Sequence, residues 1–323
     1  MSQKKLIIFM PSIEGGGVEK NLFIISNFIS SKIKNGTLIT SSKSFNKHFN
    51  NLKIINPKIN IENHSSRRFK YFLCLLELIK VLLKDKNYLV FSFQANLYCA
   101  LLCKLLNVNI IIRSNSSPSG WKLNFFRKTI FKLLLKLPNK IIVNSEEFKK
   151  EYKKKFKLKT ICIYNPLDKN FIKKKSKENK VHNFFKNFKG LKIIFIGRLV
   201  DQKDPFTLLK ALNLIKNKIN YRSIIIGKGV FKEEMNNYIR KNKLQKNIKI
   251  MGWSKNPYFF LNLSNLLVLT SKFEGLPNVL LEAITLKKFV ISSNCPTGPG
   301  EILDNGKGGM LFKVGDYKDL SKK

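Results

Sequence analysis

The chain has 323 residues, of which 44% are hydrophobic and 11% aromatic. This length and composition suit two globular domains and exclude a disordered chain. The formal net charge of +41 would attract anionic partners such as nucleic acid or acidic membranes. Only seven of the 61 basic residues are arginines, and Lys, Asn, Ile and Phe are plentiful. Codon drift in an AT-rich genome therefore explains the charge without a dedicated partner.

The five cysteines form no C-x-x-C pair and the three histidines are scattered, so no metal site or metal cofactor is expected. The apolar run at residues 6–10 is too short for a signal peptide. No apolar stretch approaches the roughly 18–20 residues that span a bilayer. We expect a cytoplasmic protein.

Short apolar runs alternate with helical patterns in the first half of the chain. The predicted strands of a parallel sheet are 5–10, 88–93, 109–113 and 140–145. The predicted helices between them are 68–84, 97–106 and 121–137.

The second half repeats this alternation. Its predicted strands are 192–197, 223–229, 248–252, 266–271 and 289–293, and its helices are 205–217, 231–242 and 277–287. We predict an α/β fold with two Rossmann-like, doubly wound domains, 1–167 and 190–323, that face a cleft at the carboxyl ends of their strands. The lysine-rich segment 168–189 is predicted to be a linker with one short helix.

A glycine-rich turn, "SIEGGGVEKN", follows the first strand. Gly16 and Gly17 would expose backbone N–H groups at the start of a helix, a position that favours phosphate or sugar. The spacing is neither G-x-G-x-x-G nor G-x-x-x-x-G-K. A plain tight turn explains it equally well.

Arg198 and Lys203 follow the first strand of the second half, ahead of a helix that Asp204 and Pro205 would open. A guanidinium fork and a mobile ammonium at the carboxyl end of a strand suit a diphosphate.

Two acids, Glu274 and Glu282, have seven residues between them and flank a turn and a helix start. The amides of the turn between them would form a helix N-terminus and thus a second anion site. Carboxylates accept hydrogen bonds from adjacent hydroxyls, as a sugar requires. A glycosidase pair is disfavoured: eight helical steps span about 12 Å, against roughly 5–9.5 Å between glycosidase carboxyls.

"EGLPNVLLE" resembles the E-x7-E signature of family 4 retaining glycosyltransferases, which have the GT-B fold. "GGGVE", "GRLVDQKDP", "GKG", "GWSKNPYFFLNLSNLLVLTS" and "NCPTGPGEIL" agree in the same order. The resemblance implies retaining transfer of a sugar from a nucleotide-diphosphate donor without a required metal, to a glycan or lipid-linked acceptor in cell-envelope polysaccharide synthesis.

The resemblance also assigns roles to individual residues. Arg198 and Lys203 would hold the diphosphate, Glu274 the donor sugar and Glu282 the ribose. The backbone at Gly16, Gly17, Gly275, Leu276, Asn278 and Val279 would complete the phosphate and sugar contacts, and Gly252 and Trp253 would flank the nucleobase.

Two departures from the family pattern stand out. Many family members carry a histidine in the N-terminal half that approaches the donor sugar. The loop after strand 109–113 has no histidine, so Arg113, Asn115 or Ser116 would lie near the donor sugar instead. The chain also ends at "GDYKDLSKK", before the helix with which family members usually continue. "NCPTGPGEIL" holds Glu301, for which a structural role in a Gly-Pro turn is favoured over ligand binding.

Residues 121–137 combine one apolar helical face (Phe126, Ile130, Leu133, Leu134, Leu137) with Lys128, Lys132 and Lys136 on the other. A core-facing helix is the favoured interpretation, and peripheral binding to an anionic membrane is the alternative. Two other functions stay open: a nucleotide-sugar epimerase of GT-B fold, and a basic nucleic-acid-binding protein. No specific nucleic acid is expected, because the lysines are spread along the whole chain.

Overall fold

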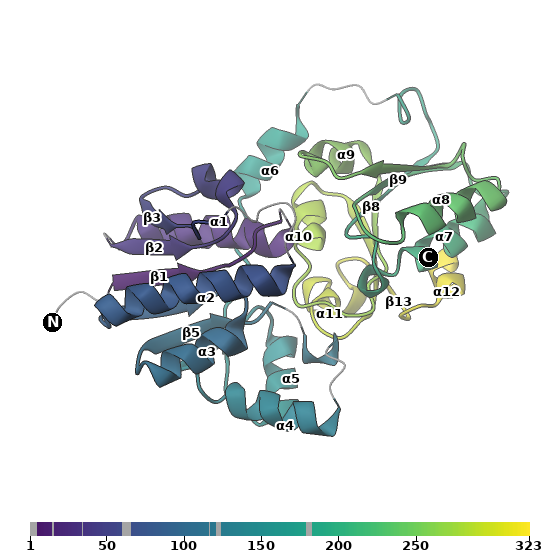
Figure 1. Ribbon diagram of the computed structural model, residues 1–323. Coiled ribbons are helices and arrows are strands. Elements are labelled where there is room, and N and C mark those ends of the chain that lie inside the picture. The colour runs from purple at the N-terminus through teal and green to yellow at the C-terminus, as the bar shows by residue number, and fades with distance from the viewer. Residues whose placement is uncertain are drawn as a thin grey trace. The chain divides into compact units, whose positions relative to one another are not determined.

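The computed structural model describes residues 5–14, 16–33, 35–59, 66–115, 117–120, 124–178 and 183–323, apart from the side chains of Ser119 and Phe125. The chain divides into two compact units, Met1–Pro166 and Leu167–Lys323. Figure 1 shows their elements. Each unit is an α/β layer structure built on its own parallel sheet.

The sheet of the first unit has the strand order β3-β2-β1-β4-β5-β6-β7 within the described residues, and every pairing is parallel. The strands are β1 Lys5–Phe9, β2 Gly36–Ile39, β3 Leu52–Ile55, β4 Tyr88–Ser92, β5 Asn109–Arg113, β6 Lys140–Val143 and β7 Ile161–Cys162. The helices are α1 Gly17–Ser30, α2 Arg67–Lys84, α3 Asn96–Leu105, α4 Phe125–Leu134 and α5 Glu146–Phe156, with short 3-10 turns η1 Lys43–His48 and η2 Pro118–Gly120.

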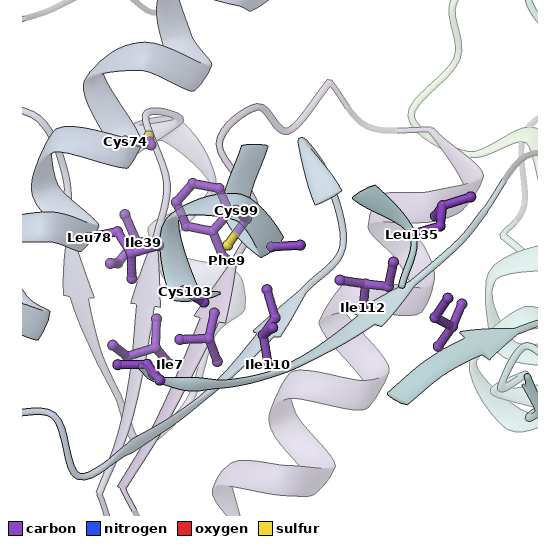
Figure 2. Close-up of a cluster of buried hydrophobic side chains, with 14 of the residues drawn as sticks. Ile7, Phe9, Ile39, Cys74, Leu78, Cys99, Cys103, Ile110, Ile112 and Leu135 are labelled. Carbon is purple, nitrogen blue, oxygen red and sulfur yellow. The ribbon is translucent and has the colours of Figure 1, made fainter. Parts of the chain in front are cut away.

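Both faces of this sheet are covered, as its continuous apolar strands require. Cys74 of α2 and Cys99 of α3 pack on one face, in the cluster that contains Ile7 and Ile110 (Figure 2). Phe148 of α5 belongs to the same cluster. Helix α1 packs on the other face through Leu22. The cysteines therefore serve as small apolar core residues, and burial raises the pKa of Cys74 to about 12.

The second unit repeats the design with the order β10-β9-β8-β11-β12-β13, again parallel throughout. Its strands are β8 Leu191–Ile196, β9 Tyr221–Ile226, β10 Ile248–Gly252, β11 Leu266–Leu269, β12 Phe289–Ser293 and β13 Met310–Phe312. Its helices are α6 Lys169–Ser176, α7 Pro205–Ile215, α8 Lys232–Lys241, α9 Pro257–Leu263, α10 Asn278–Thr285, α11 Pro299–Ile302 and α12 Tyr317–Lys322, with 3-10 turns η3 Asp201–Lys203 and η4 Asp304–Gly306.

Each sheet has one point where the direction of strand succession reverses. It lies between β1 and β4 in the first unit and between β8 and β11 in the second. Ligands of open α/β sheets bind in the crevice beyond the carboxyl ends of the two strands at such a point. The topology thus singles out the loops after β1 and β4, and those after β8 and β11.

The predicted α/β fold of two doubly wound sheets is confirmed. The structure adds β2, β3, β7 and β13, which have two to four residues and gave no readable pattern. Segment 168–189, expected to be a linker with one short helix, contains the helix α6, which packs against α9 and α10 of the second unit. The side chain of Asn256 reinforces this packing by donating to the Lys175 carbonyl at 2.8 Å.

Candidate functional site

The loops after β8 and β11 meet through an ion pair. The Lys203 ammonium contacts the Glu274 carboxylate, although 71 residues separate them in the chain. Both side chains are shielded, with 16% and 8% of their surface exposed. The backbone of Lys203 is held in place, because its carbonyl accepts a hydrogen bond from the Thr270 hydroxyl at 2.8 Å. The pair therefore lies at the strand reversal, where the topology predicts a ligand.

Glu274 is held by its own loop and by the next one. The Ser271 hydroxyl donates to the Glu274 carboxylate at 2.6 Å. The Thr297 hydroxyl donates to the Glu274 carbonyl at 2.6 Å. Burial and the neighbouring Glu274 charge raise the pKa of the Cys295 thiol to about 12, so Cys295 stays a neutral thiol beside the carboxylate.

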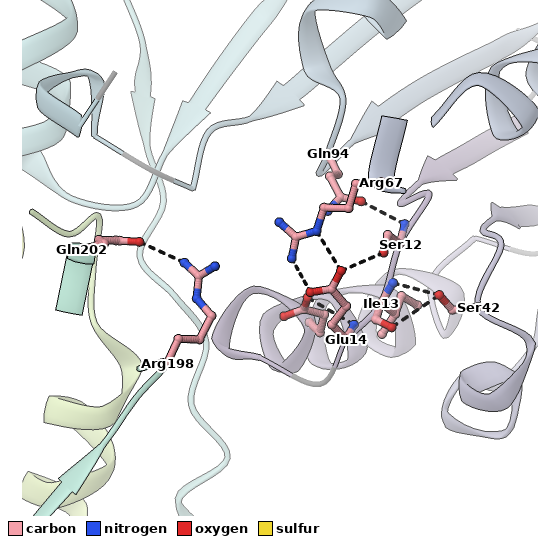
Figure 3. A network of polar contacts seen from close by, with 9 residues as sticks. Ser12, Ile13, Glu14, Ser42, Arg67, Gln94, Arg198 and Gln202 are labelled. Atoms are coloured by element: carbon pink, nitrogen blue, oxygen red, sulfur yellow. Dashed lines mark hydrogen bonds and ion pairs between the residues drawn. The ribbon is translucent and has the colours of Figure 1, made fainter. Parts of the chain in front are cut away.

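Arg198 lies on the same strand end and is exposed. Its guanidinium donates to the Gln202 side chain at 2.9 Å (Figure 3). Gln202 in turn donates to the Phe273 carbonyl at 3.1 Å. This chain of contacts aligns Arg198 with the β11 loop while leaving most of its guanidinium donors for an incoming anion.

The turn before α10 depends on a close approach between two glycines. Gly298 has φ +91°, and a Cβ there would lie 2.5 Å from the Gly275 carbonyl oxygen and 2.7 Å from Pro277. The "TGPG" segment therefore packs directly against the Gly275–Asn278 turn. Gly298 thus has a structural role in this segment, and the structural role of Glu301 stays a prediction.

Glu282 lies on α10, and 3% of the residue is exposed. The Tyr258 hydroxyl of α9 donates to its carboxylate at 3.4 Å. Leu276, Asn278 and Val279 occupy the turn and the first helical positions. The backbone amides in the first turn of a helix have no partner within that helix, which is the property that suits phosphate.

Gly252 is the last residue of β10 and Trp253 follows it, next to the loop after β9. The Gly227 amide donates to the Gly252 carbonyl at 2.8 Å. Trp253 is 49% exposed and the Lys228 ammonium lies 5.8 Å from its ring centre. An exposed indole beside a cation is a surface on which a planar base can stack.

In the first unit, Gly16 caps α1 and Gly17 is its first residue. The preceding loop is tied to the β4 loop, because Gln94 accepts from the Ser12 amide at 2.9 Å (Figure 3). Arg67 of α2 forms an ion pair with Glu14, its Nε donating at 2.7 Å. Glu14 also donates its amide to Glu19 at 3.4 Å, and burial raises the pKa of the Glu19 carboxyl.

Arg113 does not take the place of the absent histidine. It is 1% exposed, and its Nη2 donates at 3.0 Å to the Ile163 carbonyl and to the Asn165 side chain. Burial lowers the pKa of Arg113 to about 10. Asn115 donates to the Phe93 carbonyl at 3.1 Å, and Ser116 lies outside the described residues. Arg113 is thus a structural residue that binds the end of the first unit to β5.

Sequence reasoning missed the residues that position the two acids, which are Ser271, Thr297 and Tyr258. It also missed Gln202, which positions Arg198. Ser271 follows the buried strand β11 by two residues and places a polar side chain at the site edge, a signal that could have been used. Tyr258 comes from a different helix, and nothing in its local sequence points to Glu282. Among the described residues, no three His, Cys, Asp or Glu side chains gather into a metal-binding group. Nor is any described helix long and apolar enough to cross a membrane.

The fold matches solved GT-B glycosyltransferases. Anabaena HepE, solved in complex with UDP and glucose, superposes with a TM-score of 0.79 at 19% identity, covering 99% of this chain and 88% of HepE. TarM matches with a TM-score of 0.76 at 15% identity, over 99% of this chain and 91% of TarM. Two parallel sheets with reversal-point loops of this kind define the GT-B class.

The chain belongs to the glycosyl transferases group 1 family, whose model matches residues 176–323. An uncharacterised glycosyltransferase of Methanocaldococcus jannaschii is 30% identical over 315 residues, 93% of this chain and 71% of that protein. A Campylobacter jejuni N-acetylgalactosamine-N,N'-diacetylbacillosaminyl-diphospho-undecaprenol 4-alpha-N-acetylgalactosaminyltransferase is 24% identical over 336 residues, 98% of this chain and 88% of that protein. The protein is therefore a glycosyltransferase.

Proposed function

We propose that this glycosyltransferase retains anomeric configuration and moves a sugar from a nucleotide-diphosphate donor to a glycan or polyprenyl-linked acceptor of a cell-envelope polysaccharide. Its family 4 membership rests on the E-x7-E resemblance at Glu274 and Glu282. The lipid-linked acceptor is suggested by the Campylobacter relative, whose name includes a diphospho-undecaprenol. The donor sugar would be a hexose or an N-acetylhexosamine.

The observation that carries the proposal is the Lys203–Glu274 pair at the strand reversal. A bound diphosphate would draw Lys203 toward its own negative charge, with Arg198 as the second cation. Glu274 would then be free to accept hydrogen bonds from the donor sugar. Without donor, Lys203 and Glu274 would thus be each other's partner. With donor bound, the diphosphate would be the partner of Lys203 and the sugar the partner of Glu274.

The remaining roles follow the same placement. Glu282 would hold the ribose, and the amides near Gly275, Leu276, Asn278 and Val279 the phosphates. Trp253 and Gly252 would flank the base. Gly16 and Gly17 of the first unit would contribute backbone contacts to phosphate or sugar.

The bonds and the proton of the proposed transfer are accounted for without a metal ion. The bond between the anomeric carbon and the diphosphate oxygen breaks as the acceptor hydroxyl oxygen bonds to that carbon. The hydroxyl proton ends on the leaving diphosphate. Arg198 and Lys203, which would already hold the diphosphate, would also stabilise the additional negative charge that grows on this group as it leaves.

The test is a donor panel followed by product analysis. UDP-, GDP- and ADP-sugars are screened by thermal shift, where a donor at 100 times its Kd stabilises by about 2.7 kcal/mol. The selected donor is then incubated with polyprenyl-diphosphate-linked glycans, and the new linkage is assigned by NMR. An inverted anomer would contradict the retaining assignment, and a panel without any stabilising donor would contradict the donor class. A polyprenyl-linked acceptor would place the enzyme on the cytoplasmic membrane face.

A further inference from the structure

The outer surface of α2, α3 and α4 carries a concentration of exposed apolar side chains. These three helices hold ten of the 23 large hydrophobic side chains that are exposed among the described residues. They are Phe69, Phe72, Leu76 and Leu83 on α2, Tyr98, Leu101 and Leu105 on α3, and Phe126, Ile130 and Leu133 on α4. We call these ten residues the outer apolar surface.

The residues are not scattered around their helices. On α2 their spacing is three, four and seven residues, on α3 three and four, and on α4 four and three. At 3.6 residues per turn, each set falls within about 60° of arc. Each helix therefore presents one narrow apolar stripe to solvent, opposite the stripe that α2 and α3 bury against the sheet.

The three stripes belong to one layer. Helices α2 and α3 pack in the same core cluster on one face of the sheet, and α3 packs against α4. Figure 1 shows α2, α3 and α4 following one another across the first unit. The prediction that 121–137 faces the core is wrong for α4, because Phe126, Ile130 and Leu133 are 72%, 39% and 59% exposed.

Helices α2, α3 and α4 carry a large excess of positive charge. They contain nine Lys or Arg residues and one acid, Glu77. Lys84, Lys104 and Lys128 are exposed beside the stripes. A cavity of about 270 Å³ near the end of α4 is also basic, since Lys136, Lys140 and Lys159 line it.

We propose that the outer apolar surface docks on an anionic lipid bilayer, with its apolar stripes in the headgroup region and its basic residues on lipid phosphates. A second copy of the chain is disfavoured, because two surfaces of this charge, on chains of formal charge +41, repel each other. An anionic bilayer instead satisfies both features, since it accepts apolar side chains and attracts each nearby basic residue.

The placement fits the proposed use of a polyprenyl-linked acceptor. Helices α3 and α4 follow β4 and β5, so both begin near the carboxyl edge of the sheet. Phe126 and Tyr98, near these starts, would bring that edge to the lipid. The surface lies on α2–α4 of the first unit, whereas the proposed donor residues, apart from Gly16 and Gly17, belong to the second, so vesicle binding and donor binding are separately measurable.

The experiment is co-sedimentation of the full chain with vesicles of phosphatidylcholine alone or with 30% phosphatidylglycerol, at about 0.15 and 0.5 M salt, without donor or acceptor. We expect binding only to the anionic vesicles, with part of it kept at high salt, where charge is screened. The variant Phe72→Ser, Leu105→Ser, Phe126→Ser should bind at least tenfold more weakly.

The matched control is Phe28→Ser, Val230→Ser, Phe289→Ser, which removes apolar side chains of similar exposure outside α2–α4 and should bind like the wild type. Circular dichroism and nucleotide binding check that both variants are folded. Arg127→Gln, Lys128→Gln, Lys132→Gln should lose more affinity than Lys232→Gln, Lys241→Gln, Lys246→Gln, an equal charge change in the second unit.

Three results would overturn the proposal. The first is no preference for anionic over neutral vesicles, and the second is equal binding of the apolar variant and its control, which would leave only diffuse charge. The third is wild-type dimerisation in light scattering that the apolar variant abolishes, which would assign the surface to a second copy. None of these results would bear on sugar transfer.

Discussion

Lys203 and Glu274 form an ion pair across the strand reversal of the second unit, and the Ser271 hydroxyl donates to the same carboxylate at 2.6 Å. Each group is shielded, so neither can lose its partner without another charge or hydrogen bond in its place. A diphosphate for Lys203 and sugar hydroxyls for Glu274 are such replacements.

The first prediction separates the two halves of this pair. Glu274→Gln removes the carboxylate that competes for Lys203, so pyrophosphate should bind at least as tightly as to the wild type. Turnover should fall about 100-fold or more, because a neutral amide replaces the charged acceptor of the donor-sugar hydroxyls. Calorimetry and initial rates measure the two effects. Wild-type turnover would contradict a contact between Glu274 and the donor sugar. A loss of pyrophosphate affinity would contradict competition between Glu274 and the diphosphate for Lys203.

The second prediction concerns Glu282. If it holds the ribose, Glu282→Ala should weaken binding of the selected nucleoside diphosphate about 10- to 100-fold, the value of one or two bonds to a charged group. Pyrophosphate, which has no ribose, should bind normally. Tyr258→Phe is the control, because it removes the 3.4 Å bond to Glu282 and keeps the carboxylate. Equal weakening of both ligands would indicate a structural role for Glu282.

The third prediction tests the support of the Gly275 turn. Gly298→Ala would place a Cβ 2.5 Å from the Gly275 carbonyl at φ +91°, whereas Gly306 has φ +105° and open space around it. Both variants carry the backbone cost of a positive φ, on the order of 1 kcal/mol. Urea unfolding should show Gly298→Ala to be less stable than Gly306→Ala by at least about 1 kcal/mol. Equal costs would mean that the turn does not depend on this contact.

The fourth prediction is a pH dependence that Glu19 adds to the first unit. Burial raises its pKa above the ordinary value of 4.5, so in the pH window between these values the folded chain binds more protons than the unfolded chain. Its contribution to stability is therefore greatest below pH 4.5 and falls as the pH rises through the raised pKa. Glu19→Gln should stabilise the protein at pH 7, and the gain should vanish toward pH 4. Urea midpoints across this range measure it, and a gain that persists at pH 4 would contradict burial of the Glu19 carboxyl as the cause.

Much of this organisation could be predicted from the sequence. The apolar runs that form β1, β4, β5 and β8 are long and buried on both faces, so their pattern is unambiguous. Strands such as β7, with two residues, exist only because neighbouring strands pair with them, and no local signal marks them. Tertiary pairing decides these elements.

The candidate site shows the same division. Arg198, Lys203 and Glu274 were placed from their position after strands, and the structure puts them on the loops at the strand reversal. Arg113 has the same kind of position, at the end of β5, yet its side chain is buried against the 163–165 segment. The exposure of α4 was equally unreadable, because an amphipathic pattern does not say whether its apolar face meets a core or solvent.

The most direct measurement of the central claim is pyrophosphate binding and sugar transfer by Arg198→Ala, Lys203→Ala, compared with Lys232→Ala, Lys241→Ala. Both doubles remove two positive charges, and circular dichroism checks that each is folded. If Arg198 and Lys203 hold the diphosphate, the first double should lose about 100-fold or more in pyrophosphate affinity and nearly all turnover, while the control keeps both. Wild-type affinity and transfer in the Arg198–Lys203 double would contradict the assignment.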